Sequence, residues 1–277
     1  MCRFLALEVE RPQFYVLNTL LNAFISSSLC DPYLAKLKNI NGSSHDDGWG
    51  FASIGSINET PVINHYKSMN PIYNDLSREI ISRFINRFSR YEKLYLILHS
   101  RRTSKTEPWG QEYSHPYNYV LGKMVYWFAH NGSCKKKMIA EKLGVNPWIK
   151  TDSELLGQFI VLNTVNCMRD ENGIDKCIVD VYNRSREFIE FNSALNTALL
   201  ILLDSNPYLY VSHWVNTNNQ IIENYYSIYS YISEELVLAG SISIKEYLPP
   251  PYQDKLNKLE YGVYRLKPGE IVKLSPL

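Results

Sequence analysis

Cys2 is the residue in this chain whose position gives it the clearest chemical potential. An initiating methionine is usually trimmed before a small residue, which would leave a thiol and a free α-amine on one residue. An α-amine titrates at about pH 7.7–8.0, so part of it is neutral at pH 7 and can take the thiol proton. Cys2 therefore predicts a nucleophile that carries its own base. The alternative is a plain cysteine at the start of an edge strand over residues 2–7.

Asn131 and Gly132 follow an apolar segment, residues 124–129, that is typical of a strand. A thiolate that attacks an amide creates an oxyanion, which needs fixed hydrogen-bond donors. An asparagine side chain and the N–H of the next glycine can supply two, each worth about 3 kcal/mol of barrier in comparable sites. Asn-Gly is also the commonest dipeptide of tight hairpin turns. Both interpretations stay open at this point.

Arg101 and Asp152 are the charged residues that stand at the ends of predicted elements. Arg101 follows a strand-like segment, residues 94–100, and an arginine there can bind a small carboxylate through two hydrogen bonds. A surface ion pair is the simpler explanation. Asp152 precedes an apolar helix over residues 155–161. Thr151 and Glu154 match a helix capping box, which explains those two residues but leaves Asp152 with only a favourable helix-dipole contact.

The remaining cysteines, Cys30, Cys134, Cys167 and Cys177, show no C-x-x-C or zinc-type spacing. An odd, sparse set favours a reducing compartment over a disulfide framework, so we expect each to pack as a small apolar side chain. Cys30 or Cys134 could instead be the nucleophile of a Cys-His hydrolase. The six histidines form no H-x-x-x-H or H-x-H pair, which argues against a metal site.

Composition narrows the class of partner. The chain of 277 residues has 29 Lys and Arg against 28 Asp and Glu, so its net charge of +1 gives no basic excess for nucleic acid. The longest apolar runs, such as residues 198–203, are far short of the ~20 residues of a membrane span, and no secretory signal is visible. We therefore expect no nucleic acid, no membrane and a cytoplasmic location. No linker divides the chain, which predicts one domain.

Helical and strand patterns alternate without the regularity of a doubly wound fold. Apolar residues recur at helical spacing over residues 14–25 and 72–88, whereas residues 94–100 and 124–129 are strand-like. Residues 198–213 and 261–274 predict hairpins around turn residues. This mixture favours an α+β protein, with antiparallel sheets covered by helices.

Short motifs along the chain, taken in order, resemble those of the class II glutamine amidotransferase domain, one of the N-terminal nucleophile hydrolases. The likeness is strongest to a compact stand-alone branch that includes γ-glutamyl hydrolases of thiol metabolism. It covers residues 2–277 as a single domain and implies a four-layer αββα sandwich of two stacked antiparallel sheets. The motifs are Cys2-Arg3-Phe4-Leu5-Ala6, Asp47-Gly48-Trp49-Gly50, His99-Ser100-Arg101, His115-Pro116-Tyr117, His130-Asn131-Gly132 and Thr151-Asp152-Ser153-Glu154.

The resemblance implies a role for each matching position. The implied nucleophile is Cys2, with its α-amine as base, and Asn131 and Gly132 form the oxyanion hole. A glutamyl head group is zwitterionic, and one fixed cation and one fixed anion complement it. The substrate-binding residues are Arg101 for the α-carboxylate, Asp152 for the α-ammonium and, by a weaker match, Ser104. The three motif histidines, His99, His115 and His130, match no catalytic role and are expected to be structural.

The implied reaction is cleavage of a γ-glutamyl amide through a thioester, without metal or organic cofactor. Its implied partners are a small γ-glutamyl substrate and, as a further option, a synthase that accepts the ammonia. Arg102 and Lys105 add positive charge where the family usually has small or neutral residues, which favours a conjugate with extra negative charge over free glutamine. The alternative is a catalytically silent member of the same fold that binds glutamine or a partner protein.

Overall fold

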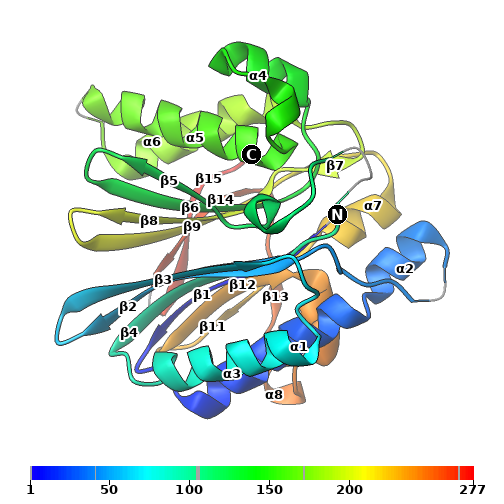
Figure 1. Cartoon of the computed structure of the whole chain (residues 1–277), viewed down its shortest axis with the longest axis vertical. Coiled ribbons are helices and arrows are strands. Elements are labelled where there is room, and N and C mark those ends of the chain that lie inside the picture. Colours follow the sequence, from blue (N-terminus) through cyan, green and yellow to red (C-terminus); the bar gives the residue numbers. More distant parts are fainter. Residues whose placement is uncertain (1, 41, 104–106, 171, 268) are drawn as a thin grey trace.

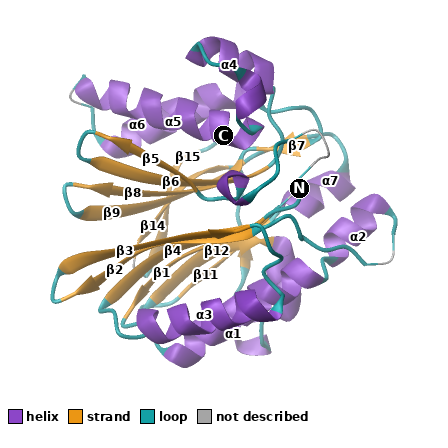
Figure 2. Cartoon of the chain, in the orientation of Figure 1, coloured by secondary structure: helices purple, strands orange, loops and turns teal. Residues whose placement is uncertain are grey.

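Two β-sheets lie face to face, and helices cover the outer face of each (Figures 1 and 2). The structure is a computed structural model, and it describes residues 2–40, 42–103, 107–170, 172–267 and 269–277. Within these ranges we find no helix with the length and apolar character needed to cross a bilayer. The arrangement is the αββα sandwich that was expected, and all the pairings between neighbouring strands are antiparallel.

The first sheet has seven strands in the order β13-β11-β12-β1-β4-β2-β3. Its outer face packs on α1 (Phe14–Leu29) and α3 (Asp75–Phe88), two amphipathic helices whose apolar stripes join one core with Leu5, Leu7 and Val9. The strands are β1 (Arg3–Glu10), β2 (Trp49–Ile57), β3 (Thr60–Ser68), β4 (Lys93–Ser100), β11 (Ile228–Ile232), β12 (Leu236–Ser241) and β13 (Asn257–Lys258).

The second sheet has six strands in the order β15-β14-β9-β8-β6-β5. Helices α4 (Lys136–Leu143), α5 (Asp152–Arg169) and α6 (Ile174–Ser185) form the other outer layer, and the last two pack on Phe128 and Leu199 of the sheet. The strands are β5 (Tyr117–Leu121), β6 (Met124–Asn131), β8 (Asn196–Leu203), β9 (Asn206–His213), β14 (Gly262–Lys267) and β15 (Glu270–Ser275).

Helices α2 (Pro32–Lys38) and α7 (Gln220–Tyr226) lie to one side of the sandwich in Figure 1, as does β7 (Ser193–Ala194), which pairs with β10 (Val215–Asn216). Helix α8 (Pro250–Gln253) lies near the bottom of the view.

Strand β1 is buried on both faces and explains how the layers are joined. Leu5, Leu7 and Val9 point into the helix-covered core, whereas Phe4 and Ala6 point into the apolar layer between the two sheets. Because β1 pairs with β4 on one side and β12 on the other, it is an inner strand. The edge-strand alternative for residues 2–7 is therefore wrong.

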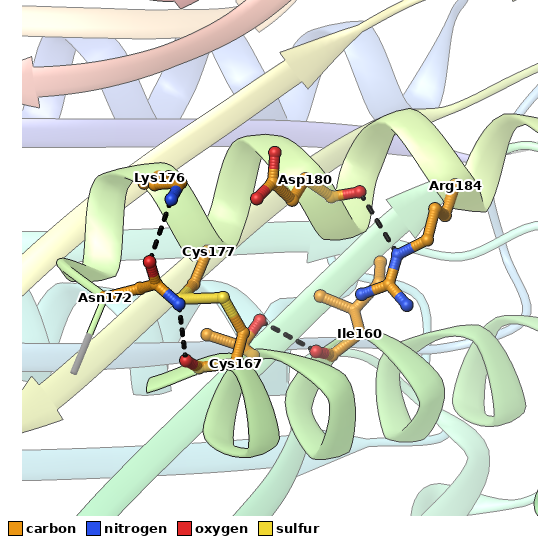
Figure 3. Close-up of a disulfide and its surroundings, with 8 residues drawn as sticks. Ile160, Cys167, Asn172, Lys176, Cys177, Asp180 and Arg184 are labelled. Atoms are coloured by element: carbon orange, nitrogen blue, oxygen red, sulfur yellow. Dashed lines mark hydrogen bonds between the residues drawn. A yellow bond between two sulfur atoms is a disulfide. The ribbon is translucent and has the colours of Figure 1, made fainter. Parts of the chain in front are cut away.

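A disulfide joins Cys167 to Cys177, contrary to the expectation that no cysteines would pair (Figure 3). Helix α5 ends at Arg169 and α6 starts at Ile174, so the chain reverses and brings the two Cα atoms to 5.6 Å. A sequence spacing of ten residues does not reveal this return. Of the free cysteines, Cys134 is buried as expected, but Cys30 is exposed.

Candidate active site

The backbone around Cys2 is held on both sides. Its N–H donates to Asn131 Oδ1 at 3.0 Å, a contact between the two sheets. Its thiol lies against the backbone of Arg102, whose N–H donates to Sγ at 3.4 Å and whose carbonyl oxygen lies 3.6 Å from Sγ. Cys2 is 7% exposed, so the sulfur is nearly enclosed yet still lines a cavity.

Arg3, the next residue, fixes the start of β1. Its fully buried guanidinium donates from Nε to Asp31 Oδ2 at 2.6 Å and lies 4.1 Å from the centre of the Tyr225 ring. His45 Nε2 lies 2.7 Å from the same carboxylate oxygen. A buried charge needs such partners, so Arg3 ties the strand beside Cys2 to the start of α2 and to α7.

Asn131 is the last residue of β6 and Gly132 follows it, and the two do not form a hairpin turn. Strand β6 pairs with β8, with Asn131 opposite Asn196, and helices α4, α5 and α6 intervene along the chain. Glycine is required at position 132, since a Cβ there would lie 2.0 Å from the Ala194 carbonyl oxygen. The plain-turn alternative is therefore wrong, and close packing positions this backbone.

Arg101 follows β4 and is 3% exposed. One edge of its guanidinium is occupied, because Nη2 donates to Thr103 Oγ1 at 3.1 Å and to the Pro108 carbonyl at 2.8 Å. Its Nη1 has no hydrogen-bond partner among the described residues. A buried guanidinium nitrogen of this kind needs an acceptor, and a carboxylate in the adjoining cavity can supply one.

The loop before β2 supports this segment. Thr103 N–H donates to Asp47 Oδ2 at 2.8 Å, and Arg101 N–H donates to the Gly48 carbonyl at 2.8 Å. Gly48 has φ +110°, and a Cβ there would lie 2.4 Å from Ser114 Oγ. Only glycine adopts this conformation in so little space.

Asp152 is the first residue of α5. Thr151 Oγ1 accepts from Glu154 N–H at 3.0 Å, which confirms the predicted cap. The Asp152 carboxylate accepts from Cys134 N–H at 2.9 Å and from Ser153 N–H at 2.6 Å. These backbone donors hold the carboxylate in one orientation at the helix N-terminus.

One cavity of about 940 Å³ brings most of the predicted site residues together. Cys2, Arg101, Gly132 and Asp152 line it, coming from the start of β1, the end of β4, the end of β6 and the start of α5. Asn131 is buried behind Gly132 and contacts Cys2. Ser104, the sixth predicted residue, lies outside the described residues.

The three motif histidines are buried and uncharged. Burial lowers the pKa of His99 to about 3 and lowers that of His130, whose Nε2 donates to the Ala194 carbonyl at 2.9 Å. Burial, and then the neighbouring His99 and Arg101, place the pKa of His115 well below its ordinary value. Its two ring nitrogens have no partner among the described residues, and it lines the cavity. The sequence placed His115 in a motif but did not predict that it lines the cavity.

Cys134 lies 3.9 Å from His130 Nδ1, which is the geometry that a Cys-His alternative would need. Burial, together with the nearby Asp152, Glu190 and Glu107 carboxylates, raises the pKa of its thiol well above the ordinary value. A protonated thiol beside a neutral imidazole is a poor nucleophile. Among the residues that the structure describes, no three His, Cys, Asp or Glu side chains are grouped to hold a metal ion.

Sequence reasoning also missed several cavity residues that belong to no motif. Tyr226 at the end of α7 and Lys38 at the end of α2 reach the cavity from distant parts of the chain. Lys135 and Lys137, at the start of α4, line the same space. No sequence signal marks these residues, because only the fold brings them near Cys2.

Two solved structures are similar to this chain. The structure of the allosteric regulatory enzyme of purine biosynthesis matches with a TM-score of 0.53 and 11% identity, over 99% of this chain and 49% of that one. The present chain thus spans about half the length of that enzyme, and the likeness concerns the fold. A predicted glutamine amidotransferase from Pseudomonas aeruginosa PA01, solved at 2.0 Å, matches with a TM-score of 0.49 and 11% identity, over 98% of this chain and 96% of that one.

At the level of sequence, no curated protein matches the chain significantly. A family model described as glutamine amidotransferases class-II matches residues 25–201, more than half of the chain. This match assigns the family, and the four-layer sandwich is consistent with it. The chain belongs to the class II glutamine amidotransferases.

Proposed function

We propose that this protein hydrolyses a γ-glutamyl amide through a thioester on Cys2, with residues 2–277 acting as one domain. The observation that carries the proposal is that Cys2, Arg101, Gly132 and Asp152 line one cavity although they come from four separate elements. Family membership supports an enzyme that acts on a small, glutamine-like molecule. The nucleophile and the reaction are our proposal.

Arg101 and Asp152 bind the two charges of the glutamyl head group. The α-carboxylate accepts from Arg101 Nη1, the nitrogen that has no partner among the described residues. The α-ammonium pairs with the Asp152 carboxylate, whose other contacts are backbone and serine donors. With both charged groups on the α-carbon held, the side chain extends so that its γ-carbonyl reaches the sulfur. Ser104 remains a proposed substrate contact outside the described residues.

The reaction begins after Met1 has been removed. The free α-amine of Cys2 takes the thiol proton, and the sulfur attacks the γ-carbonyl carbon. The oxyanion accepts from Gly132 N–H and from the Asn131 side chain. Because Asn131 Oδ1 faces the Cys2 nitrogen, its Nδ2 is the atom left to donate.

Collapse of the tetrahedral intermediate breaks the C–N bond while the Cys2 ammonium returns its proton to the leaving nitrogen. Ammonia or an amine departs and leaves a γ-glutamyl thioester. Water then attacks this carbonyl with the amine again as base, the C–S bond breaks, and glutamate and the thiol are restored. Delivery of the ammonia to a separate synthase is a further option within the same chemistry.

The test is the intact mass of protein purified from its native host, before and after treatment with a diazoketone or chloroketone that mimics glutamine. We expect a mass without methionine and then one adduct on residue 2. Cys2→Ala should take up no adduct and release no ammonia from glutamine, whereas Cys30→Ala, which changes an exposed thiol, should behave as wild type. An unprocessed and unlabelled native chain supports the silent binding protein instead. Full turnover by Cys2→Ala would favour another nucleophile.

A further inference from the structure

The rim of the cavity carries more positive charge than a glutamyl head group requires. Besides Arg101, the cavity is lined by Arg102 and four lysines, namely Lys38, Lys135, Lys136 and Lys137. Its carboxylates are Asp152, Glu107 and Glu190. The cations therefore outnumber the anions by a wide margin, in a chain whose overall net charge is only +1.

Ion pairs with neighbouring carboxylates neutralise only part of this excess positive charge. Lys136 forms an ion pair with Glu107 at 3.0 Å, and Arg102 Nη1 lies 3.8 Å from Asp46. Lys38, Lys135 and Lys137 form no ion pair within the described ranges of the chain. Lys135 donates to the Glu187 carbonyl at 2.8 Å, and Lys137 lies 5.7 Å from the centre of the Trp148 ring, and neither contact cancels a charge.

The three lysines reach the cavity from both halves of the sandwich. Lys38 ends α2, which lies beside the seven-stranded sheet, whereas Lys135 and Lys137 stand at the start of α4, in the helical layer over the other sheet (Figure 1). Burial and the nearby Arg102 lower the pKa of Lys38, against the opposing effect of Asp46 and Asp47. The Arg102 cation thus repels that of Lys38, and an anion bound beside the two would relieve this repulsion.

We propose that the substrate is a γ-glutamyl amide whose amine part itself carries an anionic group, a carboxylate or a phosphate, which binds among Lys38, Lys135 and Lys137. This inference rests on the proposed function. Once Arg101 and Asp152 hold the two charges of the head group, the only lining carboxylate without an ion pair among the described residues is Glu190. Free glutamine has no further charge to meet the three lysines, whereas an acidic amine does.

The experiment compares γ-glutamylglycine with γ-glutamylglycinamide, which differ by one negative charge, and uses glutamine as the reference substrate. Each exposed cation contributes a factor of about two to three, so kcat/KM should favour the glycine conjugate about tenfold. The ratio should fall as ionic strength rises, since exposed charges are screened. A γ-glutamyl conjugate of phosphoethanolamine compares a phosphate with a carboxylate. The anion that the site prefers is the one whose conjugate gives the larger kcat/KM relative to γ-glutamylglycinamide.

Variants locate the effect. The triple variant Lys38→Gln, Lys135→Gln, Lys137→Gln should bring the ratio close to one. Lys36→Gln is the matched control, because Lys36 is exposed on the same short helix and does not line the cavity. A wild-type ratio near one, with all three substrates hydrolysed, would overturn the inference and leave the proposed function standing. Failure to hydrolyse any of them would overturn the proposed function, and the inference with it.

Discussion

Loss of the bond between Cys167 and Cys177 should lower the free energy of unfolding without disturbing the cavity. The disulfide closes a loop with a sequence separation of 10 residues. The loop-entropy relation then gives about 2.7 kcal/mol at 25 °C. In a protein of this size each kcal/mol shifts the melting temperature by about 2–4 °C, so the expected decrease is about 5–10 °C.

Loss of the disulfide should leave the candidate active site unchanged, because the two are far apart. Asp152 begins α5 and Cys167 lies near its other end. At about 1.5 Å of rise per residue the two are about 22 Å apart along the helix axis. The rate of glutamine hydrolysis at 25 °C should therefore be the same in oxidised and reduced protein, provided that both are folded.

The assay is thermal unfolding of wild-type protein refolded with and without a phosphine reductant, which isolates the bond without changing a side chain. A double variant, Cys167→Ala with Cys177→Ala, should melt near the reduced protein and show no response to reductant. Cys30→Ser is the matched control and should respond as wild type, because Cys30 is a free, exposed thiol. Titration of the oxidised protein in denaturant should find three thiols, Cys2, Cys30 and Cys134. Five thiols, or equal melting with and without reductant, would refute the reasoning.

Three other perturbations test the site and its surroundings. Gly132→Ala places a Cβ 2.0 Å from the Ala194 carbonyl oxygen, so urea denaturation should show a loss of about 1–3 kcal/mol and ammonia release should stop; unchanged stability would contradict the packing argument. Asp152→Asn removes the charge opposite the α-ammonium and should lower kcat/KM for glutamine about 10- to 100-fold, mainly through KM; an unchanged KM would argue against this role. Burial lowers the pKa of His45 to about 4 and that of His99 to about 3, so the folded state binds fewer protons than the unfolded state. Each neutral histidine contributes its full stability above about pH 6.5. As the pH falls from there toward the folded pKa, the free energy of unfolding decreases by about 1.4 kcal/mol per pH unit for each histidine. Urea denaturation at pH 7, 6 and 5 should show this slope, and a flat profile would contradict it.

The fold was predictable where its signals are local. The apolar stripe of α1 and the turn residues between β8 and β9 follow from spacing and residue type, and Asp204 and Ser205 do adopt positive φ. The position of β1 between β4 and β12 was not predictable from its residues alone, because it depends on contacts with segments far along the chain. The disulfide escaped for the same reason, since only the return from α5 to α6 brings its cysteines together.

Some residues of the candidate site were likewise predictable from the sequence, and others were not. Cys2, Arg101 and Asp152 were identified from motif order, and the fold places them around one cavity. Lys38 was not identified, since nothing in its neighbourhood distinguishes it from Lys36 before α2 is placed. Arg102, which follows a motif, was recognised from the sequence as extra positive charge, whereas the lysines that line the cavity are brought there by the fold.

The inner position of β1 has a consequence for motion at the proposed nucleophile. Chain ends usually fray, because little holds them. Here the residue after Cys2 is anchored in a buried ion pair, and strands flank β1 on either side, so the sulfur is attached to a strand that is held on both edges. In the proposed reaction, the conformational entropy of the residue that carries the nucleophile is therefore lost when the sheet forms, and it is not lost again each time a substrate binds.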